Sequence, residues 1–308
     1  MVEAVSILLI GLILLLAGSS ILVTSTEKIK NYFSISGFFA SFFMIGVATS
    51  APEIFISIES ALQNETILAL GNGIGSNISN IALVFCISML FIKKNTNSFS
   101  MPLKPFISMI FISITLFFLI VFDSFFDMYD SIVLIIVLLI SFYYFINSDT
   151  KNIQAEKNEK SLLAILSFFI IGLLMLIYGS DLFINGATDI ALMLGVSSYV
   201  IGLTLTALGT SLPELSASIQ SARKGYHDFI IGNIIGSNIF NIAVAVALAG
   251  LINSTSVDIN DFIRDISIFL LSVLIFYLIV NTNKNLIRTV YSIALVITYI
   301  LYVLYLLK

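Results

Sequence analysis

The stretch that decides the fold is FFASFFMIGVATSAPEIFISI, residues 38–58, an apolar run with the sequence TSAPE (Thr49–Glu53) near its centre. A second apolar run holds TSLPE, Thr210–Glu214. Proline removes a backbone donor from a helix, and a carboxylate that leaves water loses its hydration. One such position is typical of a packing kink in a membrane helix. A matching pair, each with a glutamate beside the proline, indicates a function.

The composition is that of an integral membrane protein. Hydrophobic residues make up 59% of the chain and charged residues 10%, and the mean hydropathy is +1.09. A soluble domain has about 45–50% apolar and about 25% charged residues. Apolar stretches of about 20 residues, enough to cross the hydrocarbon core, recur along the chain, whereas barrel strands are short and alternating. The spans are therefore helices, and the N-terminal segment, which lacks the basic region of a signal peptide, is expected to be the first of them.

The predicted fold class is an all-α polytopic membrane protein with ten transmembrane helices. The expected spans are residues 3–25, 36–62, 66–92, 103–122, 129–147, 161–184, 197–222, 227–252, 262–281 and 287–306.

The basic residues favour one orientation in the cell membrane. Cytoplasmic loops are enriched in lysine and arginine. With ten spans, all basic residues except Arg264 and Lys308 fall in alternate connections. Both termini are therefore expected outside, and the polar linker 148–160 in the cytoplasm.

The sequence repeats itself at an offset of 161 positions, which pairs Glu53 with Glu214. The same offset aligns GNGIGSNISN (71–80) with GNIIGSNIFN (232–241). Five spans in each half mean that the second half enters the membrane from the opposite face. We therefore expect a first five-helix repeat at 1–147, the linker at 148–160 and an inverted second repeat at 161–308. Inverted repeats are typical of transporters, with the substrate site at the midplane. Helices 2 and 7, and helices 3 and 8, are expected to meet there.

Glu53 and Glu214 need a positive partner at that depth. Acidic groups inside a membrane face the protein interior and mark ion or proton paths. The interiors of helices 2, 3, 7 and 8 contain no lysine, arginine or histidine. Two unpaired carboxylates brought together would repel each other, so that one would take up a proton. Mobile cations would relieve this repulsion.

The neighbouring residues offer further oxygen ligands. Hydroxyls three and four residues before each glutamate share its helix face, and polar stripes of asparagine and serine recur every four residues on helices 3 and 8. Glycines beside the stripes permit close helix approach. An all-oxygen site suits Ca²⁺ or Na⁺ and disfavours zinc or copper. Two carboxylates neutralise one Ca²⁺ or two Na⁺. These candidate residues are Thr49, Ser50 and Glu53; Thr210, Ser211 and Glu214; Asn72, Ser76 and Asn80; and Asn233, Ser237 and Asn241, of which Asn72 and Asn233 could serve helix packing alone.

These motifs, in two inverted halves, closely resemble the repeats of sodium/calcium exchangers of the prokaryotic or archaeal type, in the cation/calcium exchanger superfamily. The resemblance implies that Glu53 and Glu214 are central ligands for both ions. It also implies a sliding gate formed by the glycine-rich helices 1 and 6. Among the supporting groups it implies Ca²⁺ contacts from Thr49 and Thr210, Na⁺ contacts from Ser50, Ser211, Ser76 and Ser237, flanking amides at Asn80 and Asn241, and backbone carbonyls near Gly46 and Ala207.

The chain departs from the family pattern at a few positions. The family usually reads GTSLPE in both repeats, whereas the first copy here has Ala48 and Ala51 in place of glycine and leucine. Asn241 stands where K⁺-dependent relatives carry aspartate, which suggests that K⁺ is not cotransported.

The favoured function is Na⁺/Ca²⁺ antiport by alternating access, in a membrane transporter that is not an enzyme. Its closest alternative is Ca²⁺/H⁺ exchange, since carboxylates also bind protons. A cation channel fits duplicated prolines in inverted halves less well, and an intramembrane hydrolase lacks a base beside Ser50 or Ser211. The expected partners are Ca²⁺, Na⁺ and the lipid bilayer, with no prosthetic group and a monomer as the functional unit. The net charge of −4 argues against nucleic acid, and the single Cys86 excludes an internal disulfide.

Overall fold

The structure is a computed structural model that describes residues 1–92, 101–146, 161–196, 209–282 and 284–306. The described residues are almost all helical, and two short strands, β1 (Phe125–Phe126) and β2 (Thr255–Ser256), pair antiparallel. The first half contains α1 (Val2–Phe33), α2 (Gly37–Ala40), the π-helical η1 (Ser41–Gly46), α3 (Val47–Thr49), α4 (Ala51–Leu62), α5 (Thr66–Ser79), the π-helical η2 (Asn80–Phe85), α6 (Cys86–Met89), α7 (Leu103–Asp123) and α8 (Met128–Ile146). The second half contains α9 (Leu162–Met193), α12 (Leu212–Lys224), α13 (His227–Phe240), the π-helical η4 (Asn241–Val246), α14 (Ala247–Ile252), α15 (Ile259–Asn281) and α16 (Asn285–Leu306).

The helices are those of a multi-pass membrane protein. Among the described residues, 8 helices are long and apolar enough to span a membrane, or 9 when the bent pair Gly37–Thr49 and Ala51–Leu62 is taken as one span. The expected seventh span, 197–222, begins with residues 197–208, which lie outside the described residues. The count of ten therefore stays a prediction.

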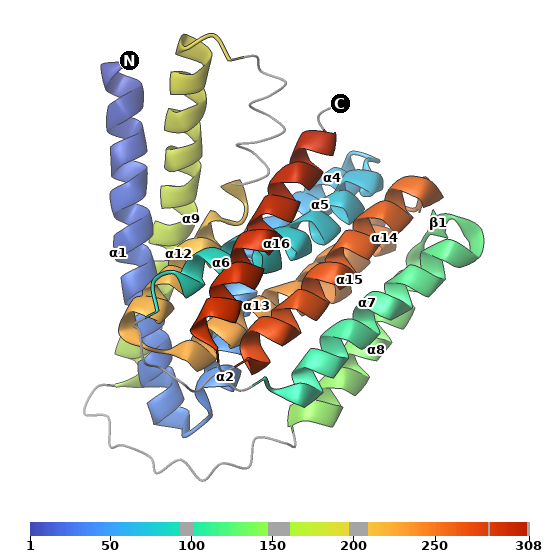
Figure 1. Cartoon of the computed structure of the whole chain (residues 1–308), viewed down its shortest axis with the longest axis horizontal. Coiled ribbons are helices and arrows are strands. Elements are labelled where there is room, and N and C mark those ends of the chain that lie inside the picture. Colours follow the sequence, from blue (N-terminus) through green and yellow to red (C-terminus); the bar gives the residue numbers. More distant parts are fainter. Residues whose placement is uncertain (93–100, 147–160, 197–208, 283, 307–308) are drawn as a thin grey trace.

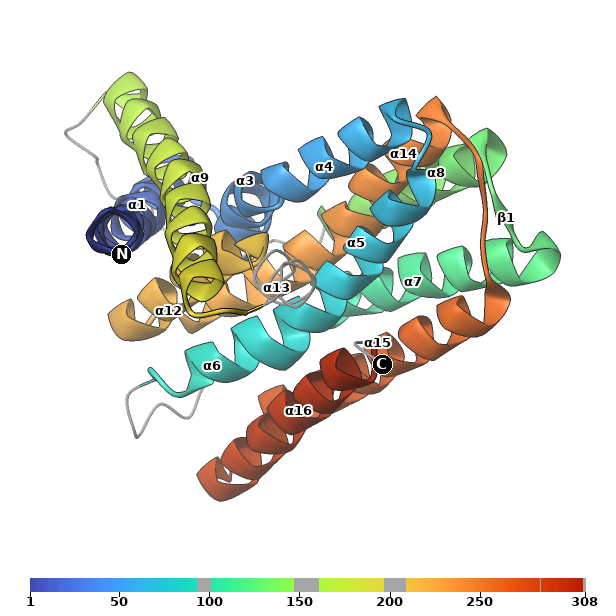
Figure 2. The same ribbon diagram turned by 90° about the horizontal axis from the view of Figure 1, so that it is seen from above.

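Helices α1 and α9 stand side by side at one edge of the molecule (Figures 1 and 2). They run antiparallel, and glycines at seven-residue spacing bring their backbones together. A side-chain carbon on Gly18 would lie 2.8 Å from the backbone nitrogen of Leu176, and one on Gly172 would lie 2.7 Å from that of Leu22. Only glycine permits this approach, so the two helices form a closely packed pair.

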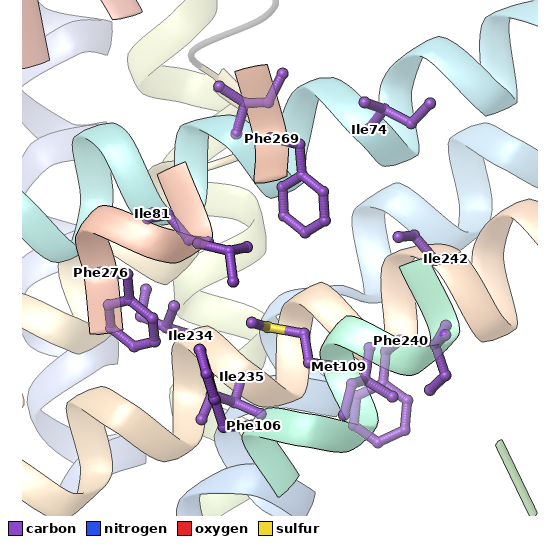
Figure 3. Close-up of a cluster of buried hydrophobic side chains, with 14 of the residues drawn as sticks. Ile74, Ile81, Phe106, Met109, Ile234, Ile235, Phe240, Ile242, Phe269 and Phe276 are labelled. Atoms are coloured by element: carbon purple, nitrogen blue, oxygen red, sulfur yellow. The ribbon is translucent and has the colours of Figure 1, made fainter. Parts of the chain in front are cut away.

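The remaining helices enclose an apolar core. Met109 on α7 is buried beside Phe106 and the isoleucines of α13, and Phe269 and Phe276 of α15 complete the cluster (Figure 3). Helix α13 is buried over almost its whole length, which makes it the central element of the body.

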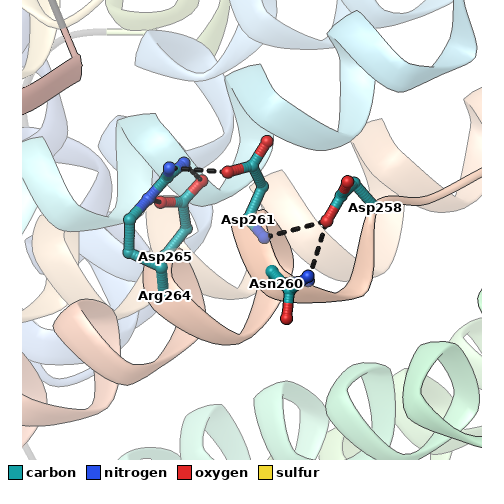
Figure 4. A network of polar contacts seen from close by, with 5 residues as sticks. All are labelled: Asp258, Asn260, Asp261, Arg264 and Asp265. Carbon is teal, nitrogen blue, oxygen red and sulfur yellow. Dashed lines mark hydrogen bonds and ion pairs between the residues drawn. The ribbon is translucent and has the colours of Figure 1, made fainter. Parts of the chain in front are cut away.

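The N-terminal end of α15 is fixed by charged groups. The Asp258 carboxylate accepts hydrogen bonds from the backbone nitrogens of Asn260 at 2.9 Å and Asp261 at 3.3 Å. Arg264 lies between Asp261, at 2.7 Å, and Asp265, at 2.6 Å (Figure 4). The guanidinium group is thus held near the start of α15, and it lines one cavity together with residues from the middle of α5.

Residues 197–208, the first part of the expected helix 7, lie outside the described residues, so the expected pairing of helices 2 and 7 stays a prediction. Within the described part of the chain, helix 2 packs most extensively along helix 8, where α13 contacts α2 and η1, and α12 also contacts η1. Glycines on α13 explain this, because a side-chain carbon on Gly232 would lie 2.6 Å from the Phe38 oxygen and one on Gly236 would lie 2.8 Å from the Phe42 oxygen. Helix 8 thus approaches helix 2 most closely. The expected contact of helix 3 with helix 8 is present, between α5 and η4.

Candidate functional site

Both proline motifs lie at the start of a helix, at equivalent positions in the two repeats. Ser50 has φ −81° and ψ 2°, and Ser211 has φ −87° and ψ 1°, so neither residue has regular helical geometry. The proline lies in the first turn of the helix that follows, where the missing N–H would have no partner in any case. The break bends helix 2 by 42°. The prolines therefore begin new helices, which is a sharper effect than the kink predicted from sequence.

The break brings the two glutamates to helix N-termini inside the protein. Glu53 lies in the first turn of α4 and Glu214 in the first turn of α12, and both side chains are 0% exposed. The helix dipole favours negative charge at this position. The carboxyl groups lie close enough to interact electrostatically, and the hydroxyls of Thr49 and Ser50 lie beside Glu214. The two acidic groups that the repeat pairs therefore lie near each other.

Several buried oxygen atoms on helices 2, 3, 7 and 8 have no hydrogen-bond donor. In the described part of the chain they include both carboxylate oxygens of Glu53, both of Glu214, the hydroxyl of Ser50, and the amide oxygens of Asn80 and Asn241. A buried polar atom without a partner costs about 1–3 kcal/mol, and more when it is charged. No described basic side chain forms an ion pair with either glutamate. The arrangement therefore leaves acceptors ready for a positive ligand.

On one side, the site is closed by contacts between helix 2 and helix 8. The Thr49 hydroxyl lies within hydrogen-bond distance of two acceptors, the Ile45 backbone oxygen at 3.0 Å and the Asn233 amide oxygen at 3.2 Å, and 3.5 Å from the Ser237 hydroxyl. Ser237 donates to the Gly46 backbone oxygen at 3.4 Å. The structure thus brings Thr49, Gly46 and Ser237 together. Asn233 also donates to Ser218 at 3.0 Å, so it serves helix packing at the edge of the site.

The other side is more open. Ser76 lines a cavity of about 290 Å³ between α5, α15 and α16, together with Asn72, Tyr299 and the Arg264–Asp265 pair. Thr210 is half-buried. Ser211 is buried, with its hydroxyl 3.1 Å from that of Ser79, a residue that the sequence analysis did not single out. Ala207, the counterpart of Gly46, lies outside the described residues.

Two further asparagines, missed from the sequence, join the buried polar network. Asn80 donates its amide hydrogen to Asn238 Oδ1 at 3.3 Å, and Asn241 donates to Asn77 Oδ1 at 3.1 Å. Each bond connects helix 3 with helix 8. Asn77 and Asn238 are themselves related by the 161-residue offset, and that signal could have identified them.

The helix that carries Glu214 is tied to α1. Ser216 donates to the Leu15 backbone oxygen at 3.0 Å, and Lys224 donates to the Ser20 oxygen at 3.2 Å. Just beyond α12, burial and the neighbouring Glu27 raise the pKa of Tyr226 to about 12. A displacement of α1 would therefore act directly on α12.

The chemistry of the site is that of hard oxygen ligands. In the described ranges, no group of three or more histidine, cysteine, aspartate or glutamate side chains is placed to hold a metal. Two carboxylates with amide and hydroxyl oxygens suit Ca²⁺ or Na⁺, while transition metals prefer nitrogen or sulfur ligands.

Comparisons with known proteins agree with this picture. The family model described as sodium/calcium exchanger protein matches residues 3–147 and again 164–308. The uncharacterized membrane protein MJ0091 of Methanocaldococcus jannaschii is 34% identical over 82% of this chain and 82% of its own length. The sodium/calcium exchanger MaX1 of Methanosarcina acetivorans is 28% identical over 82% of this chain and 83% of its own.

The fold agrees with solved structures as well. The sodium-calcium exchanger NCX_Mj, soaked with zero Na⁺ and Ca²⁺, superimposes with a TM-score of 0.82 and 31% identity, covering 99% of each chain. The resemblance read from the motifs is confirmed, and it places the chain among membrane cation/Ca²⁺ antiporters and not among enzymes. This chain belongs to the sodium/calcium exchanger family.

Proposed function

We propose that this protein exchanges Na⁺ for Ca²⁺ by alternating access, with the ions bound between helices 2, 3, 7 and 8. One observation carries the proposal: the four carboxylate oxygens of Glu53 and Glu214 are buried together without hydrogen-bond donors. One Ca²⁺ or two Na⁺ would neutralise them, so the two ions would compete for the same charge. When two ions compete for one site that opens alternately to the two sides of the membrane, one ion is exchanged for the other.

The ligand roles follow from this centre. Glu53 and Glu214 would be shared by both ions, and the flanking amide oxygens of Asn80 and Asn241 would complete the shell. The supporting ligands proposed are Thr49 and Thr210 for Ca²⁺, Ser50, Ser211, Ser76 and Ser237 for Na⁺, and the backbone oxygens of Gly46 and Ala207. A cluster of this kind offers enough oxygens for the six to eight that Ca²⁺ takes.

The two halves of the site differ, and the difference indicates that the site is accessible from one side of the membrane only. Ser76 lines the cavity beside α15 and α16, whereas its counterpart Ser237 is fully buried and bonded to Gly46. The cavity is also lined by Arg264 and Asp265, near the start of α15, and by Leu306, at the end of α16, and the basic residues assign both of these helix ends to the outside. We therefore propose that the described conformation is accessible from outside. The α1–α9 pair would move against the body to open the other side.

The architecture proposed for this cycle is ten spans in two inverted repeats, 1–147 and 161–308, joined by a cytoplasmic linker, with both termini outside and a monomer as the working unit. The double match of one family model and the equal breaks at Ser50 and Ser211 support the two repeats.

The test is Ca²⁺ uptake into liposomes that contain the purified protein. An outward Na⁺ gradient should drive uptake, and a pH gradient alone should not. Glu214→Gln protein in the same liposomes is the matched control for leak. Uptake under the pH gradient only would favour Ca²⁺/H⁺ exchange instead, and uptake with neither gradient would indicate a channel.

A further inference from the structure

Asn77 on α5 and Asn238 on α13 are completely buried at the contact between helices 3 and 8. An asparagine amide has a donor end and an acceptor end of nearly equal shape. Its neighbours therefore decide which end faces a ligand. For a cation ligand the choice is decisive, because the nitrogen end repels the ion and the oxygen end binds it.

The neighbours of Asn77 leave it one orientation. Its Nδ2 lies 3.0 Å from the backbone oxygen of Asn238, which can only accept. The nitrogen of Asn77 must face that oxygen, so Oδ1 of Asn77 faces the other way. Asn241 Nδ2 donates to this Oδ1 at 3.1 Å. The amide of Asn241 is thereby turned with its oxygen away from Asn77.

A mirrored chain holds Asn80. Asn238 Nδ2 lies 3.7 Å from the sulfur of Met109, a weak acceptor, and Asn238 Oδ1 accepts from Asn80 Nδ2 at 3.3 Å. The amide oxygens of both Asn80 and Asn241 are then left buried and without a donor. Asn238 of the second repeat thus orients the amide of Asn80 in the first, and Asn77 of the first repeat orients the amide of Asn241 in the second.

We propose that Asn77 and Asn238 are positioning residues that hold the amide oxygens of Asn241 and Asn80 toward the bound cation. The inference rests on the proposed function, since it names what prepares that site. Asn77 and Asn238 act through their neighbours and do not touch the ion. Residues that orient metal ligands typically change metal affinity by about 10–100-fold when they are replaced.

A double-mutant cycle on purified full-length protein separates positioning from general packing. The variants are Asn238→Leu, Asn80→Ala and the pair, and the readout is the dissociation constant for Ca²⁺ at equilibrium in Na⁺-free buffer. Asn238→Leu should weaken binding by about 10-fold or more in the wild-type background. In the Asn80→Ala background it should change binding by about 2-fold at most, because the amide that it orients is gone.

The control is Met109→Leu, which keeps the core volume and removes only the weak sulfur acceptor. It should change the dissociation constant less than about 3-fold, and thermal unfolding should stay cooperative in every variant. The mirrored cycle, Asn77→Leu with Asn241→Ala, gives a second reading should Asn238→Leu fail to fold.

Equal losses in both backgrounds, or no loss from Asn238→Leu, would overturn the inference. That failure is distinguishable from failure of the proposed function. A protein that shows the predicted coupling in Ca²⁺ binding, yet does not move Ca²⁺ on a Na⁺ gradient, would contradict only the exchange reaction.

Discussion

Asn233 donates its amide hydrogen to Ser218 at 3.0 Å. The counterparts of these residues in the first half are Asn72 and Ser57, and in the described structure the Asn72 nitrogen and the Ser57 hydroxyl both lack partners. The same pair of side chains is thus bonded in one half and separated in the other. This difference agrees with a site that is closed at Ser237 and open toward a cavity at Ser76.

The hydrogen-bonded pair Asn233–Ser218 should stabilise the described conformation more than the unbonded pair Asn72–Ser57 does. Ser218→Ala would leave the Asn233 nitrogen without its best acceptor, and we expect the free energy of unfolding to fall by about 1–3 kcal/mol. Ser57→Ala removes a hydroxyl that already lacks a partner, so its effect should stay below about 0.5 kcal/mol. Denaturation of both variants in the same detergent measures the difference. Equal losses would show that the Asn72–Ser57 bond also forms.

Neutralising either buried carboxylate should remove Ca²⁺ binding without unfolding the protein. Glu53→Gln and Glu214→Gln each take away half of the charge that balances the ion, and each also relieves repulsion in the empty site. We expect equilibrium Ca²⁺ affinity to fall by about 100-fold or more, corresponding to about 2.7 kcal/mol, with thermal stability retained in ion-free buffer.

The matched control for these variants is Glu59→Gln, a change of the same kind on the exposed side of α4. It should leave Ca²⁺ affinity unchanged. Near-normal affinity in Glu53→Gln or Glu214→Gln would reject the assignment of the site.

The glycines between α1 and α9 should tolerate no added methyl group. Alanine at Gly18 would place its side-chain carbon 2.8 Å from the backbone nitrogen of Leu176, and no rotamer change can relieve a backbone contact. We expect Gly18→Ala to cost about 1–3 kcal/mol of unfolding free energy and to slow transport. Ile13→Ala, on the exposed face of the same helix, serves as the control. Wild-type stability in Gly18→Ala would contradict the close packing of this pair.

Adding a third acid should make transport more sensitive to protons. Asn241→Asp would place another carboxylate beside Glu53 and Glu214, and like charges at close range favour protonation of one of them. The decline of Ca²⁺ uptake on acidification should therefore begin at a higher pH than in the wild-type protein. Parallel pH profiles of Na⁺-driven uptake give the answer. Superimposable profiles would mean that position 241 does not face the other acids.

The sequence predicts a kink at each proline and the approach of the two glutamates, because proline distorts a helix and a carboxylate in an apolar helix needs a partner inside the protein. The complete break at each motif is seen only in the structure. It does not predict the π-helical segments η1, η2 and η4. The backbone accommodates the extra residue in each π-helical turn, so no particular side chain marks these segments in the sequence. The packing of α13 against η1 depends on which face each glycine presents.

Nearly identical repeats also hide the asymmetry of the site. The pair Asn233–Ser218 and the pair Asn72–Ser57 have the same residue types at the same spacing, so only the conformation distinguishes them. Similarly, no residue type reveals which end of the Asn80 or Asn241 amide is free, because that depends on Asn77 and Asn238.

The central claim is that Glu53 and Glu214 share a transported cation in the middle of the membrane. Anomalous diffraction from crystals soaked in Ca²⁺, or in Sr²⁺ as its heavier analogue, tests it most directly. We predict one strong peak bonded to oxygens of both carboxylates, at about 2.3–2.6 Å for Ca²⁺, which disappears when Na⁺ replaces the divalent ion. Carboxylates that stay free of any ion at saturating Ca²⁺, or that are bonded only to protein donors, would contradict the account.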